Sequence, residues 1–578
     1  MRSFDRSATS GSRQQPSDDD GDCQTDGGVE YPAHRFDSIV VISNRQPYRH
    51  EYDLETGGLT DTVGVSTTTG TDGGSGAACG SNAAIGSHSE GSEGTAPTGS
   101  ASSQSTRPGG LTIERPTGGL TAGLDPVLQR IGGTWVAWGD GDADHDVVDD
   151  RQCVSVPPDD PSYTLQRVWL DEEDLDGYYR GFSNRVLWPL CHGFPLLVED
   201  RPGDFETYRR VNRRFAETAL DHAGANSLLW LQDYHFALAP AQIADAASPS
   251  TTIGQFWHIP WPTSDVFVRC PHRRELLEGL LGNDLLGFHV DRFASRFLDC
   301  ADRLLPTASV DRETGVVTHD GGQTRVTATP LGIDADRHAR ASQEATGAFA
   351  SVADQIDLPK TTTLGLGVDR LDYTKGIPER VAALERLFER WPKWRGEFTY
   401  VQTTSPSRTE IPAYQVLGTR VRRAIERVND RFATEDWRPI VYTEDHLSRR
   451  QLSSLYRQSD LLVVSALCDG MNLVAKEYVA ANVDGDGALC LSRRAGAHEQ
   501  LGKHAFTLDP HRPDQMAETI SAAMTASEVD RRRRMSELRR RVFQCDLDWW
   551  MSRQFDSLGS RGASGGNATD RHSPQWPR

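Results

Sequence analysis

Residues 469–477 read Asp-Gly-Met-Asn-Leu-Val-Ala-Lys-Glu and place a carboxylate, a glycine and an amide in one short segment. The apolar run 461–464 before them predicts a buried strand, and the run 473–481 after them favours a helix. Ligands of open α/β sheets bind at this edge, and free N–H groups at a helix start suit phosphate or sugar oxygens. The pattern predicts either a ligand site or an ordinary turn capped by Asp469 and Asn472.

Polar side chains also follow four other predicted strands, at the point where each strand ends. Arg45 follows 39–42; Asp233, Tyr234 and His235 follow 228–231; His258 follows 253–257; Arg370 and Lys375 follow 364–368. Because the carboxyl ends of parallel strands share one edge of a sheet, two such domains facing each other would bring these side chains together in a cleft. Repeated placement of this kind favours a site over chance.

Some charged members of this set suit a nucleotide. Arg370 and Lys375 can reach the same diphosphate, the arginine as a fork and the lysine as a point charge. The alternative is a surface pair that Asp369 and Asp372 neutralise. Glu477 lies one to two turns into the predicted helix, where it can accept two hydrogen bonds from a ribose diol or remain a solvated helix charge.

The other candidates suit a sugar phosphate. Arg45 and Arg408 can hold a second anion, although either alone is more often a surface or structural arginine. His258 borders an apolar run, where an isolated histidine is by default buried and satisfied. A group of aromatic residues can stack against a sugar face or simply fill the core. It consists of Tyr178, Tyr179, Phe182 and Trp188.

Metal-binding patterns are weak in this sequence. Residues 140–144 resemble the start of an EF-hand loop, but the sixth position is His145 instead of Gly and the twelfth is Arg151 instead of Glu. We therefore expect a solvated acidic loop there and no metal site. Walker A and H-E-x-x-H motifs are absent, and a G-x-S-x-G match at 562–566 lies in a polar tail with no strand before it.

The composition disfavours several classes of partner. The 578 residues include 82 acidic and 62 basic ones, a formal net charge of −20, which disfavours nucleic acid. The nine cysteines are widely spaced and lack C-x-x-C, which argues against a disulfide framework or a zinc site. No apolar run approaches the roughly 20 residues of a membrane span. The polar N-terminus has no signal-peptide core, so we expect a cytoplasmic protein without a membrane partner.

Arginine greatly outnumbers lysine among the basic residues. This acidic, lysine-poor composition fits a halophile's cytoplasm, or alternatively an acidic enzyme from a GC-rich genome.

Short apolar runs alternate with helical patterns, which predicts mostly parallel sheets with helices on both faces. The strands are too many for a single small sheet, and a natural division falls near 330–334. We predict an α/β protein of two doubly wound Rossmann-like domains that face each other across a cleft. The expected segments are a disordered tail (1–36), a first domain (37–330) with a low-complexity insertion at about 50–107, a second domain (331–545), and a C-terminal helix with a disordered tail (546–578).

Taken together and in order, these motifs resemble the trehalose-6-phosphate synthase family, retaining glucosyltransferases of the two-Rossmann (GT-B) architecture. The resemblance covers roughly 38–545, broken by the insertion. In the first half it rests on Ser43-Asn44-Arg45, Gly118-Gly119-Leu120, 178–184, 187–189, Gln232-Asp233-Tyr234-His235, 258–262 and 284–288. In the second half it rests on 368–376, Pro406-Ser407-Arg408 and 469–477.

The resemblance implies a role for each matching residue, and it implies no metal or cofactor. Donor-binding residues would be Gly118 and Gly119 near the phosphates, Arg370 and Lys375 on the diphosphate, and Glu477 on the ribose, helped by the backbone of Leu473, Val474, Ala475 and Lys476. Asp469 and His258 would hold the transferred glucose and, with Arg370 and Lys375, form the catalytic set. Arg45, Tyr179, Trp188, Asp233 and Arg408 would bind the acceptor, glucose 6-phosphate.

The expected reaction makes α,α-trehalose 6-phosphate from a nucleotide-activated glucose and glucose 6-phosphate, in biosynthesis of a compatible solute. Two alternatives remain: a glucosylglycerol-phosphate synthase that uses glycerol 3-phosphate, and a catalytically silent sugar-phosphate sensor. Cys468 stands where the family usually has an arginine, which removes a positive charge beside the sugar site. The sequence does not choose among UDP-, GDP- and ADP-glucose, and it leaves the oligomeric state open, a homo-oligomer included.

Overall fold

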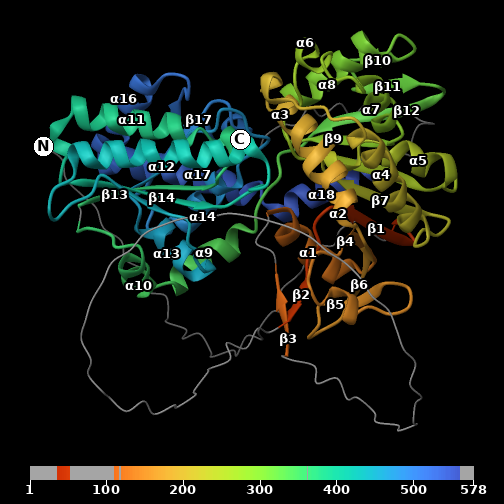
Figure 1. Cartoon of the computed structure of the whole chain (residues 1–578), viewed down its shortest axis with the longest axis horizontal. Coiled ribbons are helices and arrows are strands. Elements are labelled where there is room, and N and C mark those ends of the chain that lie inside the picture. Colours follow the sequence, from red (N-terminus) through yellow and green to blue (C-terminus); the bar gives the residue numbers. More distant parts are fainter. Residues whose placement is uncertain (1–34, 53–109, 116–118, 361, 560–578) are drawn as a thin grey trace, which may run out of the picture.

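The computed structural model describes residues 35–52, 110–115, 119–360 and 362–559. The predicted insertion from residue 53 onward, Gly118 and the G-x-S-x-G match lie outside the described residues, as does nearly all of both predicted tails. The described chain forms two lobes side by side, each built around its own sheet (Figure 1). Mostly parallel sheets in an α/β fold confirm the predicted fold class.

The first lobe has a ten-stranded sheet whose seven central strands are parallel. Its order is β10 (Ser309–Asp311), β11 (Val316–His319), β12 (Gly322–Ala328), β9 (Leu285–Phe288), β8 (Thr252–Trp257), β7 (Ser227–Gln232), β1 (Ser38–Ser43), β4 (Thr134–Trp138), β6 (Tyr163–Val168) and β5 (Cys153–Val156). The strand order reverses between β1 and β7. β5, β10 and β11 add antiparallel edges that the alternation of the sequence did not predict.

The second lobe has a six-stranded sheet in which every neighbouring pair is parallel. Its order is β15 (Ile440–Thr443), β14 (Phe398–Ser405), β13 (Thr363–Arg370), β16 (Leu461–Val464), β17 (Ala488–Ser492) and β18 (Phe506–Leu508). Numbered along the chain this is 3-2-1-4-5-6, the order of dinucleotide-binding sheets, with its switch point between β13 and β16.

Helices cover both sheets (Figure 1). Those of the first lobe are α1 (Gly119–Ile131), α2 (Glu172–Asp174), the π-helix η3 (Leu175–Leu187), α3 (Trp188–Cys191), α4 (Asp204–Leu220), α5 (Ala239–Ala246), α6 (Ser264–Phe267), α7 (Arg273–Leu280) and α8 (Asp291–Leu304). Those that follow are α9 (Ala335–Glu344), α10 (Ala348–Gln355), α11 (Ile377–Arg390), α12 (Pro412–Phe432), α13 (Arg449–Gln458), α14 (Leu473–Ala481), α15 (Ala497–Leu501), α16 (Pro513–Thr525), α17 (Glu528–Gln544) and α18 (Leu547–Leu558).

Shorter elements complete the description. The 3-10 turns are η2 (Asp144–Asp146), η4 (Pro195–Leu197), η5 (Tyr234–Phe236), η6 (Tyr373–Lys375) and η7 (Pro392–Trp394). A separate antiparallel ribbon pairs β2 (Arg49–Tyr52) with β3 (Leu111–Glu114). No helix among the described residues is long and apolar enough to cross a membrane.

The last helix, α18, returns from the second lobe to the first (Figure 1). Its Trp550 ring stacks on Trp230 of β7 with 5.6 Å between centroids, and both are buried. Gly254 of β8 leaves room for the helix, since a Cβ there would lie 2.5 Å from a Leu558 methyl carbon. This crossing buries the apolar face of α18 and ties the end of the described chain to the first sheet.

Candidate active site

Both switch points contribute side chains to one place between the lobes. β1 and β7 of the first sheet lead into Arg45 and Asp233, and β13 and β16 of the second lead into Arg370 and Asp469. Direct contacts cross from one lobe to the other: Arg408 of the second lies 3.9 Å from the ring centroid of Trp188 in the first. The carboxyl edges of the two sheets therefore share one site, as such edges do at topological switch points.

The Trp188 ring is a platform for two cations. Arg408 stacks on it at 3.9 Å, and the Arg370 guanidinium lies 5.3 Å from its centroid. Arg408 also donates to the Tyr234 hydroxyl across 3.3 Å. Cation–π contacts of this kind strengthen where water is excluded, and Arg408 is only 5% exposed. The arrangement fixes two guanidinium groups at the gap between the lobes.

The pKa of Tyr179 indicates that the electrostatic environment of this site is positive. Burial alone would raise the pKa of its hydroxyl, but the charges of Arg408, Arg45 and Arg370 lower that pKa below its ordinary value. The three arginines therefore act on one hydroxyl, in a chain of net charge −20. A partly buried, positive place of this kind is suited to a phosphate group.

Asp233 stands at the end of β7 with a backbone φ of +73°, a left-handed conformation that is costly for a non-glycine residue. Its Oδ1 accepts the Tyr234 N–H at 2.9 Å and the His258 N–H at 3.2 Å. Burial raises the pKa of Asp233 to about 6. Arg408 (φ +50°) and Asn472 (φ +83°) also have positive φ, so three residues of this site hold a costly backbone conformation.

Lys375 and Asp469 form an ion pair across the ends of β13 and β16, with 2.6 Å between Nζ and Oδ2. Asn472 donates to the same carboxylate oxygen at 3.1 Å. Burial alone would raise the pKa of Asp469, but Lys375 and this hydrogen bond hold it below its ordinary value. The carboxylate is therefore ionised at neutral pH.

The alternative assignment of Asp369 and Asp372 as surface partners of Arg370 and Lys375 is wrong. Asp369 pairs with the buried Arg380 at 2.7 Å, and Asp372 pairs with Arg408 at 3.0 Å. Asp372 is fully buried, which would raise its pKa, but Arg408, Arg370 and Lys375 lower it to about 2. Asp372 thus makes its ion pair with Arg408, while its charge also acts on Arg370 and Lys375.

The 469–477 segment is both a helix cap and a point of contact between lobes. Asn472 is the N-cap of α14 and accepts the Ala475 N–H at 3.1 Å, whereas Asp469 does not cap the helix. Gly470 touches the first lobe so closely that a Cβ there would lie 2.0 Å from the His258 carbonyl oxygen. Only glycine permits this approach.

His258 is held at the end of β8 with its Nε2 3.0 Å from Gln232 Oε1. Burial lowers its pKa to about 3, so the ring is neutral at physiological pH. A neutral imidazole can hydrogen-bond a sugar hydroxyl but cannot act as a cationic acid.

Two neighbours on α14 point in different directions. Glu477 is half-buried and accepts a hydrogen bond from the Tyr456 hydroxyl at 3.0 Å. Lys476 is fully buried and donates to the Leu331 carbonyl at 2.6 Å, in the linker between the lobes. The side chain of Lys476 is thus occupied by this contact and is not open to a substrate.

The remaining candidates are positioned as follows. Gly119 is the first residue of α1. Cys468, in place of the usual arginine, lies near Arg292, Arg296 and Arg494, although burial raises the pKa of its thiol to about 11. Tyr414 is a residue that sequence reasoning missed: its hydroxyl accepts from Arg408 at 2.8 Å. Its position at the start of α12, six residues after Arg408, was the available signal.

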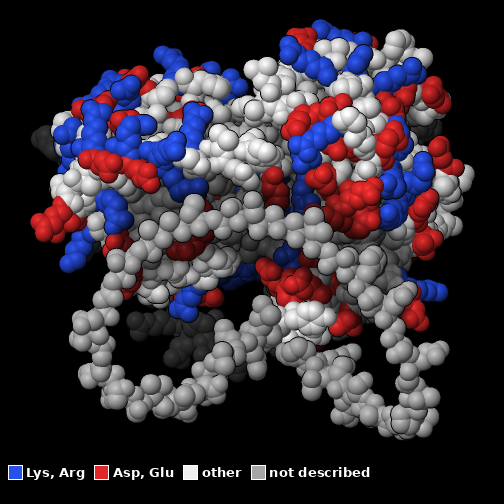
Figure 2. Space-filling model, in the orientation of Figure 1, with Lys and Arg blue, Asp and Glu red and all other residues white. Residues whose placement is uncertain are grey.

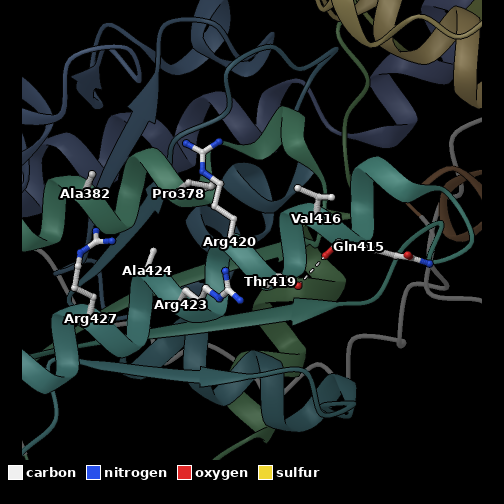
Figure 3. Close-up of a pocket in the computed structure, with 9 residues that line it drawn as sticks. All are labelled: Pro378, Ala382, Gln415, Val416, Thr419, Arg420, Arg423, Ala424 and Arg427. Atoms are coloured by element: carbon white, nitrogen blue, oxygen red, sulfur yellow. Dashed lines mark hydrogen bonds between the residues drawn. The ribbon is translucent and has the colours of Figure 1, made fainter.

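A surface groove of about 630 Å³ lies apart from these residues, between α11 and α12 (Figure 3). Arg420, Arg423 and Arg427 line it from α12, beside Pro378 and Ala382 of α11. Basic side chains gather over these two helices (Figure 2). None of the predicted site residues lines the groove.

Comparison with known proteins agrees with this geometry. The model of glycosyltransferase family 20 matches residues 94–560. A trehalose-6-phosphate synthase of Mycolicibacterium gilvum is 37% identical over 464 residues, which cover 78% of this chain and 90% of that protein.

Two solved structures share the fold. A UDP-forming α,α-trehalose-phosphate synthase of Burkholderia xenovorans, in complex with glucose-6-phosphate, has a TM-score of 0.70 and 32% identity and covers 77% of this chain and 96% of its own. An E. coli structure named trehalose-6-phosphate, bound with UDP-2-fluoro glucose, has a TM-score of 0.71 and 32% identity. The match covers 78% of this chain and 97% of that chain. These matches confirm the resemblance seen in the sequence: the chain belongs to glycosyltransferase family 20 and is a GT-B glycosyltransferase of the trehalose-6-phosphate synthase family.

Proposed function

We propose that this glycosyltransferase moves glucose from a nucleoside diphosphate glucose to glucose 6-phosphate and so makes α,α-trehalose 6-phosphate with retention. The observation that carries the proposal is that Arg45, Arg370 and Arg408 all act on Tyr179, in a site that also holds the Lys375–Asp469 pair. Two anionic substrates need two such groups of cations. The substrates of the two solved relatives described above support the same choice.

The acceptor would lie against the first lobe. Its phosphate would meet Arg45 and Arg408, and its ring would lie near Tyr179 and Trp188. Asp233, anchored by two backbone N–H groups, would accept a hydrogen bond from a sugar hydroxyl. The aromatic walls favour a pyranose over the shorter glycerol 3-phosphate, because a ring offers an apolar face to stack on.

The donor would lie against the second lobe. Arg370 and Lys375 would bind its diphosphate, with Gly118 and Gly119 approaching from the first lobe, and Glu477 and the backbone of 473–476 would bind the nucleoside. Lys375 would leave Asp469 to reach the phosphate, which frees that carboxylate for the hydroxyls of the transferred glucose.

In the transfer step the bond from the anomeric carbon to the diphosphate oxygen breaks. The bond to the acceptor hydroxyl forms on the same face, and the hydroxyl proton passes to the leaving phosphate. Arg370 and Lys375 would stabilise the charge that grows on the diphosphate. His258, neutral at its pKa of about 3, would orient the glucose instead of moving a proton. Closure of the lobes would exclude water that otherwise hydrolyses the donor.

A panel of donors and acceptors tests this assignment. Release of nucleoside diphosphate is followed with UDP-, GDP- and ADP-glucose against glucose 6-phosphate and glycerol 3-phosphate, and the sugar product is identified by NMR. We expect trehalose 6-phosphate with at least one donor. Release only with glycerol 3-phosphate would favour the glucosylglycerol-phosphate alternative. Binding of sugar phosphate without release under any condition would favour a sensor.

We also propose that the enzyme works in a salt-rich cytoplasm, where its product leads to a compatible solute. The acidic, lysine-poor composition supports this. Turnover and the unfolding midpoint should then both rise with KCl into the molar range. An optimum at low salt for both would contradict the proposal.

A further inference from the structure

A fully buried ion pair between Asp144 and Arg167 of β6 contacts Gln46, the residue after Arg45. Arg167 Nη2 is 2.8 Å from Asp144 Oδ1, and neither side chain is exposed. The expectation of a solvated acidic loop at 140–144 is therefore wrong for Asp144. Burying two charges costs more than their attraction returns unless further hydrogen bonds satisfy both groups. The hydrogen-bond partners of Asp144 and Arg167 show which part of the chain this pair fixes.

Nearly all of those partners lie on one short segment, residues 46–50. Arg167 donates from Nε to the Gln46 side-chain oxygen at 3.0 Å and from Nη2 to the Tyr48 carbonyl at 3.3 Å. Asp144 accepts the His50 N–H at 2.9 Å and the Gln46 side-chain amide. Burial opposes ionisation of Asp144, but these hydrogen bonds and Arg167 hold its pKa below the ordinary value. The pair is thus an anchor for the chain that leaves β1.

Arg45 lies between this anchor and a second one, which Trp135 and Ser43 form. On its amino side, Trp135 donates to the Ser43 hydroxyl at 2.8 Å, and that hydroxyl donates to the Arg45 carbonyl at 2.5 Å. On its carboxyl side is Gln46, which also donates to Asp140 at 2.8 Å. Arg45 itself is exposed, so packing does not fix its side chain. Its reach toward Tyr179 depends on the two anchors.

We propose that Gln46, held by Asp144 and Arg167, is a positioning residue that aims Arg45 at the phosphate of the acceptor. This inference rests on the proposed function, since it assumes a phosphorylated acceptor at Arg45. The competing explanation is that the network only secures the β2–β3 ribbon and has no effect on binding.

The test compares Gln46→Ala with Gln166→Ala. Gln166 is the matched control: it is a buried glutamine next to Arg167 on β6, and its side chain bonds Cys153, His222 and the Arg167 carbonyl but neither Gln46 nor the Asp144 carboxylate. For Gln46→Ala we expect the KM for glucose 6-phosphate to rise about tenfold, because a small misplacement of a binding group is costly. The KM for the donor and kcat should stay within about twofold of the parent.

Inorganic phosphate gives a readout that a purely structural role would not move. As a competitor of glucose 6-phosphate it probes the phosphate subsite alone, and its inhibition constant should rise in Gln46→Ala by the same factor as the KM. Gln166→Ala should change neither value. Equal effects in both variants, or an unchanged KM in folded Gln46→Ala, would overturn the inference.

A second variant covers poor folding of Gln46→Ala. Asp140→Asn acts at the more exposed end of the network, where the carboxylate is 21% exposed and pairs with Arg49 as well as Gln46, and the weakened bond to Gln46 should raise the KM about threefold. If the parent shows no turnover, the proposed function fails first. Calorimetric binding of glucose 6-phosphate to the parent and to Gln46→Ala then still decides whether Gln46 positions Arg45.

Discussion

Replacement of Lys375 by alanine should affect catalysis and stability through one ion pair. At 2.6 Å from Asp469, and with an effective dielectric constant of about 20, the gross attraction is about 6 kcal/mol. Both side chains are only 13% exposed, so the cost of desolvating the two charges offsets much of this attraction. Leaving Asp469 buried and unpaired should cost about 3–5 kcal/mol, less what Asn472 and residual solvent return.

In this variant, kcat should fall by a larger factor than the affinity for the donor. A cation aimed at developing diphosphate charge is worth about 10²- to 10³-fold in kcat. We expect Lys375→Ala to lose that much in a nucleoside diphosphate release assay. Lys393→Ala is a matched control, since Lys393 is an exposed lysine of the same lobe that lies over Trp394 at 4.8 Å. A kcat within about threefold of the parent would refute the assignment of Lys375 to the diphosphate.

The pH dependence gives an independent check. In the parent, Asp469 has a lowered pKa, so its contribution to stability is present above its unfolded pKa and is lost as pH falls through the folded value. Without Lys375, burial is opposed mainly by the Asn472 hydrogen bond and we expect the pKa to rise, so the variant is penalised at neutral pH and recovers as pH falls. The gap in unfolding midpoint between parent and variant should therefore shrink from pH 8 to pH 5. A gap independent of pH would show that the lost stability does not come from Asp469.

Two further changes test other contacts. Gly470→Ala would place a Cβ 2.0 Å from the His258 carbonyl, so the lobes should separate and kcat/KM should fall about 100-fold with little change in the circular dichroism spectrum; unchanged kinetics would show that this contact is dispensable. Lys476→Met should alter the pH dependence of stability: burial lowers the pKa of Lys476 to about 7, so the unfolded chain binds more protons between about pH 7 and 10 and this group makes the parent more stable as pH rises there. In urea unfolding across that pH range, the free energy of unfolding should rise less steeply with pH in the variant than in the parent. Parallel plots of this free energy against pH would contradict the shifted pKa.

Strand ends were predictable because buried parallel strands read as short apolar runs, and the polar residue after each run marks the same edge of the sheet. That rule located Arg45, Asp233, His258, Arg370 and Asp469. It could not show that Asp372 pairs with Arg408 rather than with Arg370 or Lys375, because that choice depends on where β14 ends relative to β13.

Burial of single charges was also beyond the sequence. Asp144 sits in an alternating acidic segment that reads as solvated, and the arginine that buries it lies 23 residues away on β6. The return of α18 to the first lobe is equally non-local, since an amphipathic helix does not show which sheet it will cover.

In the described structure, internal carboxylates occupy cations of the site: Lys375 is bound to Asp469 and Arg408 to Asp372. Each substrate must therefore compete with an ion pair. A dianionic phosphate can displace or share such a partner, because its charge and its extra acceptor oxygens exceed those of one carboxylate. A neutral sugar can do neither, and leaves Arg408 on Asp372. These pairs keep buried cations in place and cost some affinity for every substrate. If glucose 6-phosphate binds at Arg408 as we propose, these pairs would bias the site against unphosphorylated acceptors, and part of its specificity would come from the carboxylates that a substrate must replace.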